Sequence, residues 1–244
     1  MELFQLNGKR ALVTGATQGI GYAAAKILAA QGAEVWVHGS RDIEKARRAM
    51  AETGAAHAVV ADFSEHDAAD KLYAETGDMD IVISNVSVQI RSDWQSITPE
   101  QYELQTDVNL RTTLSLMQKY IPGMQKRHWG RFAAVGSVQQ IRPHSQMAVY
   151  AASKCAIQSL VENVAKQVAK DGVTINTLLP GVIRTPRNDA ALADAAYASK
   201  VLEGIPAGFA GEGYDCAFPL LLLCSEEGRY ITGASILVDG GMHL

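Results

Sequence analysis

The amino-acid sequence predicts an α/β fold, in which a doubly wound parallel sheet of about seven strands carries helices on both faces. Short apolar runs alternate with longer helical patterns along the chain, as expected for repeated strand and helix units. A glycine-rich turn follows the first run and opens directly into a helix. Since no long linker, Pro-rich segment or repeat interrupts the 244 residues, we expect a single domain spanning 1–244.

Seven apolar runs are expected to form the strands. Aliphatic and β-branched residues dominate them, which suits parallel strands buried on both faces. They lie at residues 10–14, 34–37, 57–61, 80–84, 131–137, 174–179 and 235–238.

Capping residues mark most of the expected helices. Gly32 and Gly54 are placed to end two of them, and the run from Ser64 to Asp67 to cap a third. A capping box from Thr98 to Gln101 opens a fourth. The helices are expected over 22–30, 42–53, from 98 through 109, around Tyr150 up to 171, and over the buried aliphatic run 219–224.

Gly15, Gly19 and Gly21 give the turn after the first strand the spacing G-x-x-x-G-x-G. Glycines let backbone N–H groups and the positive end of a helix approach a pyrophosphate, because a Cβ at the tight positions would obstruct it. The spacing is one residue longer than the common dinucleotide fingerprint, but the flanking strand and helix are both in place. The turn therefore indicates a cofactor bound through its phosphates.

Tyr150 and Lys154 are four residues apart, on one face of their helix, and Ser137 precedes Tyr150 by thirteen residues. An ammonium in a partly desolvated cleft can lower the pKa of a phenol, so Lys154 is expected to lean its charge toward the Tyr150 hydroxyl. The trio is a candidate proton-transfer site, although Tyr-x-x-x-Lys alone is an ordinary surface pair.

Candidate functional residues gather at the carboxyl ends of the expected strands. Gly15, Asn85, Ser137 and Pro180 each follow such a strand or occupy its last position. Right-handed crossovers bring these ends to one edge of a parallel sheet, where ligands bind in open α/β folds.

Thr14-Gly15-x-x-x-Gly19-x-Gly21, with Ser137, Tyr150 and Lys154, resembles the short-chain dehydrogenase/reductase family over nearly the whole chain. The agreement extends to Asp62, Asn85, Asn109, the segment 180–185 and the segment 238–241. The resemblance implies a Rossmann-type fold, NAD(P)(H)-dependent hydride transfer at a carbonyl or secondary alcohol, and a homo-oligomer, either tetramer or dimer.

The resemblance also implies a role for each matching residue. Tyr150 would exchange a proton with the substrate oxygen, Lys154 would lower the phenol pKa and bind the nicotinamide ribose, and Ser137 would hydrogen-bond that oxygen. Asn109 would hold a water linking Lys154 to solvent. The expected cofactor-binding residues are Gly15, Thr17, Gln18, Gly19, Ile20, Gly21, Ser40, Arg41, Asp62, Phe63, Asn85, Tyr150, Lys154, Pro180, Gly181, Ile183 and Thr185.

The end of the second strand favours NADP(H) over NAD(H). An NAD site usually carries an acidic residue there, and the corresponding position is Gly39, followed by Ser40 and Arg41. Both side chains could contact a 2′-phosphate. Asp42 and the neutral Gln18, which stands where many NADP users of the family have a basic residue, weigh against this preference. Alternatively, Ser40 or Asp42 merely caps the following helix.

The family usually has Asn-Asn-Ala-Gly after the fourth strand, whereas this chain reads Ser84-Asn85-Val86-Ser87. A side chain at Ser87 adds bulk where the backbone usually approaches the cofactor ribose. The departure leaves open a non-enzymatic alternative, a catalytically weak nicotinamide-binding sensor, which the intact Ser137, Tyr150 and Lys154 oppose.

The loops expected to bind substrate are polar. Arg91, Gln139, His144 and Arg187 are the candidate substrate-binding residues, and a fatty or steroidal substrate would favour a more apolar lining. The runs 88–91 and 137–139 look similar to members that act on sugar acids, so a small polar substrate such as a sugar acid or keto acid is expected. The alternative is a 3-oxoacyl-ACP reductase, in which Lys126, Arg127 and Arg131 could meet an acidic carrier protein.

A segment after the sixth strand, residues 184–208, is expected to form a flap over the substrate, with a short helix in its alanine-rich part. A static surface helix is the plain alternative.

Composition limits the partners. The formal net charge of −4 and the absence of a polybasic stretch argue against nucleic acid and anionic membranes. Three cysteines without metal-like spacing, and no signal peptide in the sequence, indicate a cytoplasmic protein without a metal site.

Overall fold

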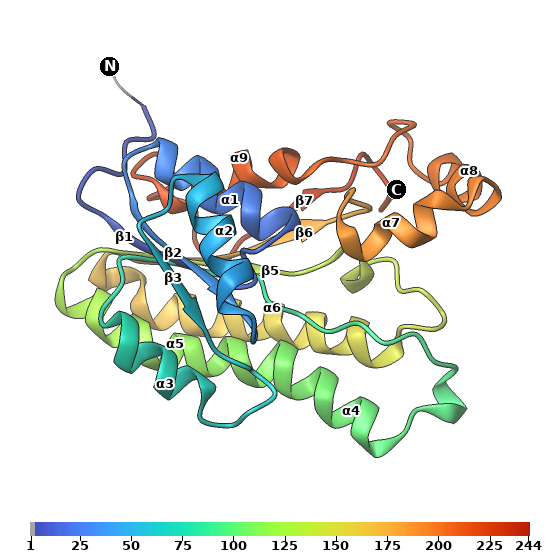
Figure 1. Cartoon of the computed structure of the whole chain (residues 1–244), viewed down its shortest axis with the longest axis horizontal. Coiled ribbons are helices and arrows are strands. Elements are labelled where there is room, and N and C mark those ends of the chain that lie inside the picture. The colour runs from blue at the N-terminus through green and yellow to red at the C-terminus, as the bar shows by residue number, and fades with distance from the viewer. Residues whose placement is uncertain (1–2) are drawn as a thin grey trace.

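The computed structural model of the protein, which describes residues 3–244, contains one seven-stranded parallel sheet (Figure 1). Its order is β3-β2-β1-β4-β5-β6-β7, so the winding direction reverses between β1 and β4. This confirms the predicted fold class. The strands are β1 (Arg10–Val13), β2 (Glu34–Gly39), β3 (His57–Val60), β4 (Ile81–Ser84), β5 (Gly130–Val135), β6 (Val173–Pro180) and β7 (Ser235–Val238).

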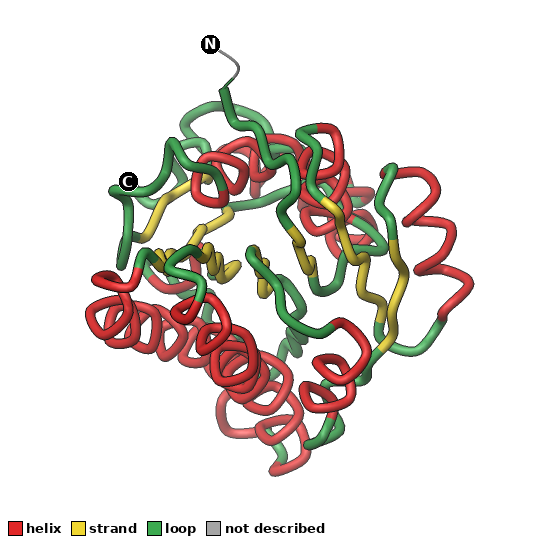
Figure 2. The backbone as a smooth tube through the Cα atoms, turned by 90° about the vertical axis from the view of Figure 1, so that its left-hand side faces the viewer, coloured by secondary structure: helices red, strands yellow, loops and turns green. Residues whose placement is uncertain are grey.

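Helices cover both faces of the sheet, so that the molecule has three layers (Figure 2). Each face has its own apolar core, because the strands are buried on both sides. One face carries α1 (Gly19–Ala30), α2 (Ile43–Thr53) and α9 (Gly213–Cys224). The other carries α3 (Ala68–Thr76), α4 (Pro99–Thr106), α5 (Thr112–Lys126) and α6 (Ala148–Val168).

Most element boundaries lie within two residues of the predicted ones. Helix α1 begins earlier than expected, at Gly19, because the turn ends at Gln18, whose φ of −166° is extended. The capping box at Thr98 and Gln101 is present, and Gly54 ends α2 in the left-handed conformation.

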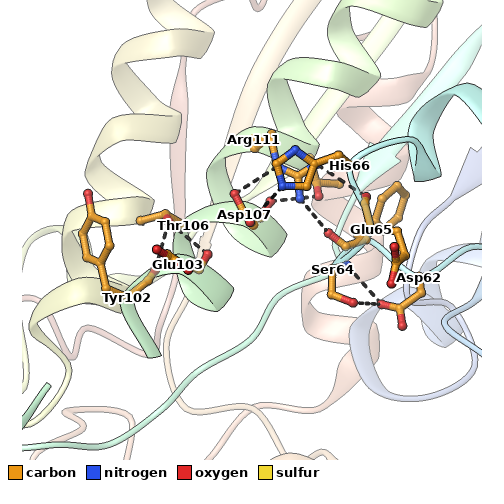
Figure 3. Close-up of polar contacts among 11 residues, drawn as sticks. Asp62, Ser64, Glu65, His66, Tyr102, Glu103, Thr106, Asp107 and Arg111 are labelled. Carbon is orange, nitrogen blue, oxygen red and sulfur yellow. Dashed lines mark hydrogen bonds and ion pairs between the residues drawn. The ribbon is translucent and has the colours of Figure 1, made fainter. Parts of the chain in front are cut away.

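The prediction that the run from Ser64 to Asp67 caps the next helix is wrong. The Ser64 hydroxyl and backbone N–H both bond Asp62 Oδ1, at 2.8 and 3.0 Å, as Figure 3 shows for the hydroxyl. Asp67 at the start of α3 makes no side-chain cap. Asp62 therefore binds Ser64 in a local turn, and Ser64 is not available to cap α3, because short polar side chains often bond nearby backbone and side-chain groups.

The helix expected from Thr98 through Asn109 continues further, but not as a uniform α-helix. Residues Asp107–Arg111 form a π-helical turn between α4 and α5. Arg111 Nε bonds Asp107 Oδ1 at 3.0 Å, and its guanidinium reaches the backbone oxygens of Phe63 and Glu65 (Figure 3). The π turn is thus joined to the loop after β3 and turns Asn109 inward.

The segment 184–208 lies beyond the carboxyl ends of the strands, at the right of Figure 1. It contains α7 (Pro186–Ala193) and α8 (Ala195–Glu203). It leaves the sheet at Ile183, which pairs with Gly211 in an isolated bridge that brings the chain back. The segment therefore stands beside the edge where the candidate residues gather.

Candidate active site

A cleft of about 390 Å³ opens at the carboxyl ends of the strands, at the reversal of the winding order. The glycine turn, the ends of β4, β5 and β6, helix α6 and the segment 184–208 line it. Its lining includes three basic side chains, Arg91, Lys154 and Arg187, and no aspartate or glutamate among the residues that the structure describes. The cleft therefore favours anionic ligands.

Asn85 holds the glycine turn in place. Its Nδ2 donates to the backbone oxygens of Thr14 and Gly15, at 3.0 and 3.1 Å. A Cβ at Gly21 would lie 2.6 Å from this same nitrogen, so only glycine fits there. Asn85 thus both holds the backbone of the turn by hydrogen bonds and lines the cleft.

His38, near the end of β2, also holds the glycine turn by a hydrogen bond. Its Nδ1 accepts the Gly15 N–H at 3.1 Å, and its Nε2 lies 3.0 Å from the Ala61 oxygen. Because a carbonyl can only accept, the proton must be on Nε2. Burial lowers the pKa of His38 to about 4, so the ring is neutral around pH 7.

The start of α1 suits an anionic phosphate. Gln18 occupies the N-cap but its side chain makes no capping bond, and the first turn carries no acidic residue. The amides of this turn are thereby left for a ligand, and they meet the positive end of the helix dipole. The residues present fit the pyrophosphate of a dinucleotide.

Ser137 and Tyr150 meet in the cleft. Ser137 lies just past β5, where its Oγ accepts the Gln139 N–H at 3.2 Å, and Tyr150 is in the first turn of α6. Burial raises the pKa of Tyr150, while the charge of Arg187 and hydrogen bonding with the Ser137 and Ser87 hydroxyls act to lower it. The net rise keeps the phenol protonated at neutral pH, ready to act as an acid.

Lys154 is buried beside Tyr150. Its Nζ donates to the Val135 oxygen at 2.7 Å and lies 5.7 Å from the centroid of the phenol ring. Burial, helped by the charge of Arg187, lowers the pKa of Lys154 to about 7. The charge that acts on the phenol in this structure is that of Arg187, and the lowering of the phenol pKa by Lys154 stays a prediction.

Asn109 lies behind the cleft, buried in the π turn. Its amide pairs with the backbone of Val88, accepting the N–H at 2.8 Å and donating to the oxygen at 3.0 Å, and also donates to Ser153 Oγ at 3.1 Å. Asn109 therefore joins the loop after β4 to helix α6, the helix that carries Tyr150.

Arg41 and Asp62 pair with each other, and neither side chain lines the cleft. Arg41 is still 78% exposed in this ion pair, and its contact with a 2′-phosphate stays a prediction. Lys45, which sequence reasoning did not single out, lies in the first turn of α2, and its Nζ donates to Oε1 of Gln18, a residue of the cleft lining, at 2.7 Å.

The four predicted substrate residues all line the cleft. Gln139 Oε1 accepts the His144 N–H at 2.6 Å, which shapes the loop between them. Arg187 bonds the Ser87 hydroxyl and backbone oxygen at 3.0 and 2.7 Å.

Most predicted site residues come together in the cleft. Those outside its lining are Gly21, Arg41, Asp62, Phe63 and Asn109. Residues of the lining that sequence reasoning had not assigned to the site include His38, Met147 and Met242. The polar His38 in an apolar strand carried a signal, whereas nothing marked Met242 near the chain end.

Lys126, Arg127 and Arg131 precede or begin β5, outside the cleft lining. Arg131 is buried and bonded to Ser225 and Glu226, and Arg127 is paired with Asp78 and Asp80. A contact of these residues with a carrier protein stays a prediction.

Within residues 3–244, no group of three or more His, Cys, Asp or Glu residues could hold a metal ion. In the same range, no helix is both long enough and apolar enough to cross a membrane.

Residues 15–243 match the family described as enoyl-(acyl carrier protein) reductase. The chain is 33% identical to 3beta-hydroxysteroid dehydrogenase 1 of Eggerthella lenta, covering 98% of this chain and 95% of the relative. It is 32% identical to the 3-oxoacyl-[acyl-carrier-protein] reductase of Escherichia coli, covering 97% and 98%.

Solved structures of similar proteins have the same overall fold. A 3-oxoacyl (acyl-carrier-protein) reductase of Agrobacterium tumefaciens with NADP bound superposes with a TM-score of 0.92 at 35% identity, covering 99% of this chain and 98% of that one. A protein from Beutenbergia cavernae, described as an NAD(P)-dependent gluconate 5-dehydrogenase with NADP at low occupancy, gives 0.92 at 31%, covering 99% of each chain. The chain thus belongs to the short-chain dehydrogenase/reductase family, a class of nicotinamide-dependent oxidoreductases.

Proposed function

We propose that the protein catalyses reversible, NADP(H)-dependent hydride transfer at the carbonyl or secondary alcohol of a small polar anion, such as a keto acid or sugar acid. The observation that carries this proposal is the meeting of Ser137, Tyr150 and Lys154 with the glycine turn in one cleft whose described lining has cations but no carboxylate. Bound nicotinamide supplies or accepts the hydride.

The protein's own residues provide proton transfer and positioning. Ser137 hydrogen-bonds the substrate oxygen and Tyr150 donates its proton to that oxygen as it gains charge. In the oxidising direction the phenolate takes the proton back, and Arg187 and the Ser137 and Ser87 hydroxyls stabilise that phenolate. Lys154, at the Val135 oxygen, lies beside Tyr150, where it can hold the ribose hydroxyls.

The test replaces Tyr150 by Phe. The variant keeps the ring and the glycine turn but lacks the acid, so turnover of a panel of keto acids, sugar acids and an acetoacetyl thioester should fall by about 10²- to 10⁴-fold. NADPH binding, followed by fluorescence, should stay within a few-fold. Near-normal turnover in Tyr150→Phe would sink the assignment.

Two alternatives have distinct outcomes in the same panel. Turnover of the thioester alone would identify a 3-oxoacyl-ACP reductase, the activity named for two of the relatives. NADPH binding by the native chain without turnover of any compound would favour a sensor.

The preference for NADP(H) rests on Lys45 at the adenosine end. Lys45→Gln should raise KM for NADPH about 5- to 20-fold and leave KM for NADH unchanged, because only NADPH carries the 2′-phosphate. Arg47→Gln, which removes a cation paired with Glu44 on the same helix, is the matched control. A lower KM for NADH than for NADPH in the native protein would refute this preference.

A further inference from the structure

Ser87 and Arg187 connect two walls of the cleft. Ser87 lies three residues beyond β4, at the position where the family usually has glycine, and Arg187 lies in the first turn of α7. Nη1 of Arg187 donates to the Ser87 hydroxyl at 3.0 Å, and Nη2 donates to the Ser87 backbone oxygen at 2.7 Å. One of the two bonds thus requires the serine side chain, which the usual glycine lacks.

The pair stands next to the reacting groups. The Ser87 hydroxyl and the charge of Arg187 both act to lower the pKa of Tyr150, and the same charge acts on Lys154. Its guanidinium is therefore within electrostatic reach of the point where the substrate oxygen must sit.

The charge of Arg187 is not neutralised by the protein. Among the described residues no aspartate or glutamate forms an ion pair with it, whereas the neighbouring Arg184 pairs with Glu212 at 3.5 Å. A guanidinium has five N–H donors, and the two bonds to Ser87 use only two of them. The remaining donors can bind an anion by charge-assisted hydrogen bonds.

We propose that Arg187, oriented by Ser87, anchors a carboxylate of the substrate within one or two carbons of the reacting carbonyl, which makes the preferred substrates 2- or 3-oxo acids and the matching hydroxy acids. The inference rests on the proposed oxidoreductase function and narrows its substrate class. Ser87 is a positioning residue in this arrangement, because it holds the guanidinium in place.

The experiment compares 2-oxobutanoate and 3-oxobutanoate with their methyl esters, which keep the carbonyl and lose the charge. In the native enzyme with NADPH, kcat/KM should favour at least one acid over its ester. Arg187→Gln should reduce that acid-to-ester ratio by about 10- to 100-fold, and Ser87→Gly by a smaller factor of about 3 to 10. Arg184→Gln, which removes a neighbouring cation that lies outside the cleft lining and pairs with Glu212, is the matched control and should leave the ratio within about twofold.

Three results would overturn the anchor while leaving the oxidoreductase function intact. The esters could be reduced as well as the acids by the native enzyme. The preference could disappear in Arg91→Gln instead of Arg187→Gln. Arg187→Gln could weaken NADPH binding and leave the acid-to-ester ratio unchanged, which would make Arg187 a cofactor contact.

If the native enzyme reduces no carbonyl, that result counts against the proposed function itself. The binding of a carboxylate to Arg187 can then still be tested by a binding measurement. Malonate should bind the native protein with NADPH present, by calorimetry, and bind Arg187→Gln about 10-fold more weakly or worse. Equal affinity for the two proteins, or no binding to the native protein, would overturn the anchor.

Discussion

At the scale of single residues, side-chain type and spacing predicted which residues line the cleft better than they predicted which partners the charged groups contact. The spacing of Tyr150 and Lys154 places their Cβ atoms on one helix face. Lys154, however, ends a flexible four-carbon stem, and the adjoining strand offers it the Val135 oxygen at 2.7 Å. That partner belongs to β5, so helix spacing alone could not reveal it. Arg187 and Ser87, a hundred residues apart, could not be paired from the sequence for the same reason.

The buried Lys154 should destabilise the unliganded fold at neutral pH. Its pKa is lowered to about 7 from 10.5, so between these pH values the unfolded chain binds a proton that the folded chain lacks. Stability therefore rises with pH through this window, and the penalty is fully present below about pH 7.

Replacing Lys154 by Met should consequently stabilise the unliganded protein by about 1–3 kcal/mol at pH 7, less toward pH 10, and abolish activity. Urea unfolding at several pH values measures this difference. Lys166→Met, at an exposed position of the same helix, should change little. A Lys154→Met variant less stable than the native protein at pH 7 would contradict the expected penalty.

At the scale of elements, the parts set by local chemistry were predictable, and those set by contacts between elements were not. The seven strands and the Thr98 capping box follow from apolar runs and caps that depend on neighbouring residues. The π turn at Asp107–Arg111 does not, because Arg111 meets Phe63 and Glu65 across the fold and Asn109 meets Val88. Ser64 was misassigned because Asp62 competes for its hydroxyl.

The buried His38 near the end of β2 should make folding stability sensitive to acid. His38 must stay neutral to accept the Gly15 N–H, and its pKa is lowered to about 4 from 6.5. Between pH 4 and 6.5 the unfolded chain binds a proton at His38 that the folded chain does not bind. The contribution of neutral His38 to the free energy of unfolding is therefore complete above about pH 6.5 and declines as the pH falls toward 4.

His38→Asn, whose amide oxygen can still accept from Gly15, should flatten this dependence. The native protein should lose about 2 kcal/mol more stability than the variant between pH 6.5 and 5. Thermal unfolding at these two pH values provides the measurement. His66→Asn, an exposed histidine, is the control, and identical pH profiles for His38→Asn and the native protein would rule this role out.

At the scale of the whole molecule, strand order and the position of the cleft follow from the alternation of strands and helices. Which apolar side chains and strand edges are exposed on the surface could not be predicted in this way. The single sheet agrees with the proposal that 1–244 forms one folding unit. Strand β7 is an unpaired edge, and the neighbouring α9 exposes Phe218 (61%) and Tyr214 (43%) on one side. Exposed strand edges and apolar side chains of this kind are often covered by another chain.

We predict that the protein is a homo-oligomer, either dimer or tetramer, that uses this region. Light scattering should give two or four times the chain mass of 26.2 kDa. Phe218→Glu should shift the mass toward the monomer, because a charge would be buried at the contact. Trp94→Glu, an exposed aromatic on a distant loop, should not. A monomeric native protein would disprove the assignment.

The hydrogen bonds of Asn109 hold two elements of the active site together. The loop after β4 and the helix bearing Tyr150 are joined through Val88 and Ser153, so they should behave as one rigid unit. The segment 184–208 is fastened to that unit through Arg187. Variation in α8, which does not contain Arg187, could therefore change which molecules enter without disturbing proton transfer, and that separation marks α8 as the place to begin redesigning the enzyme for new substrates.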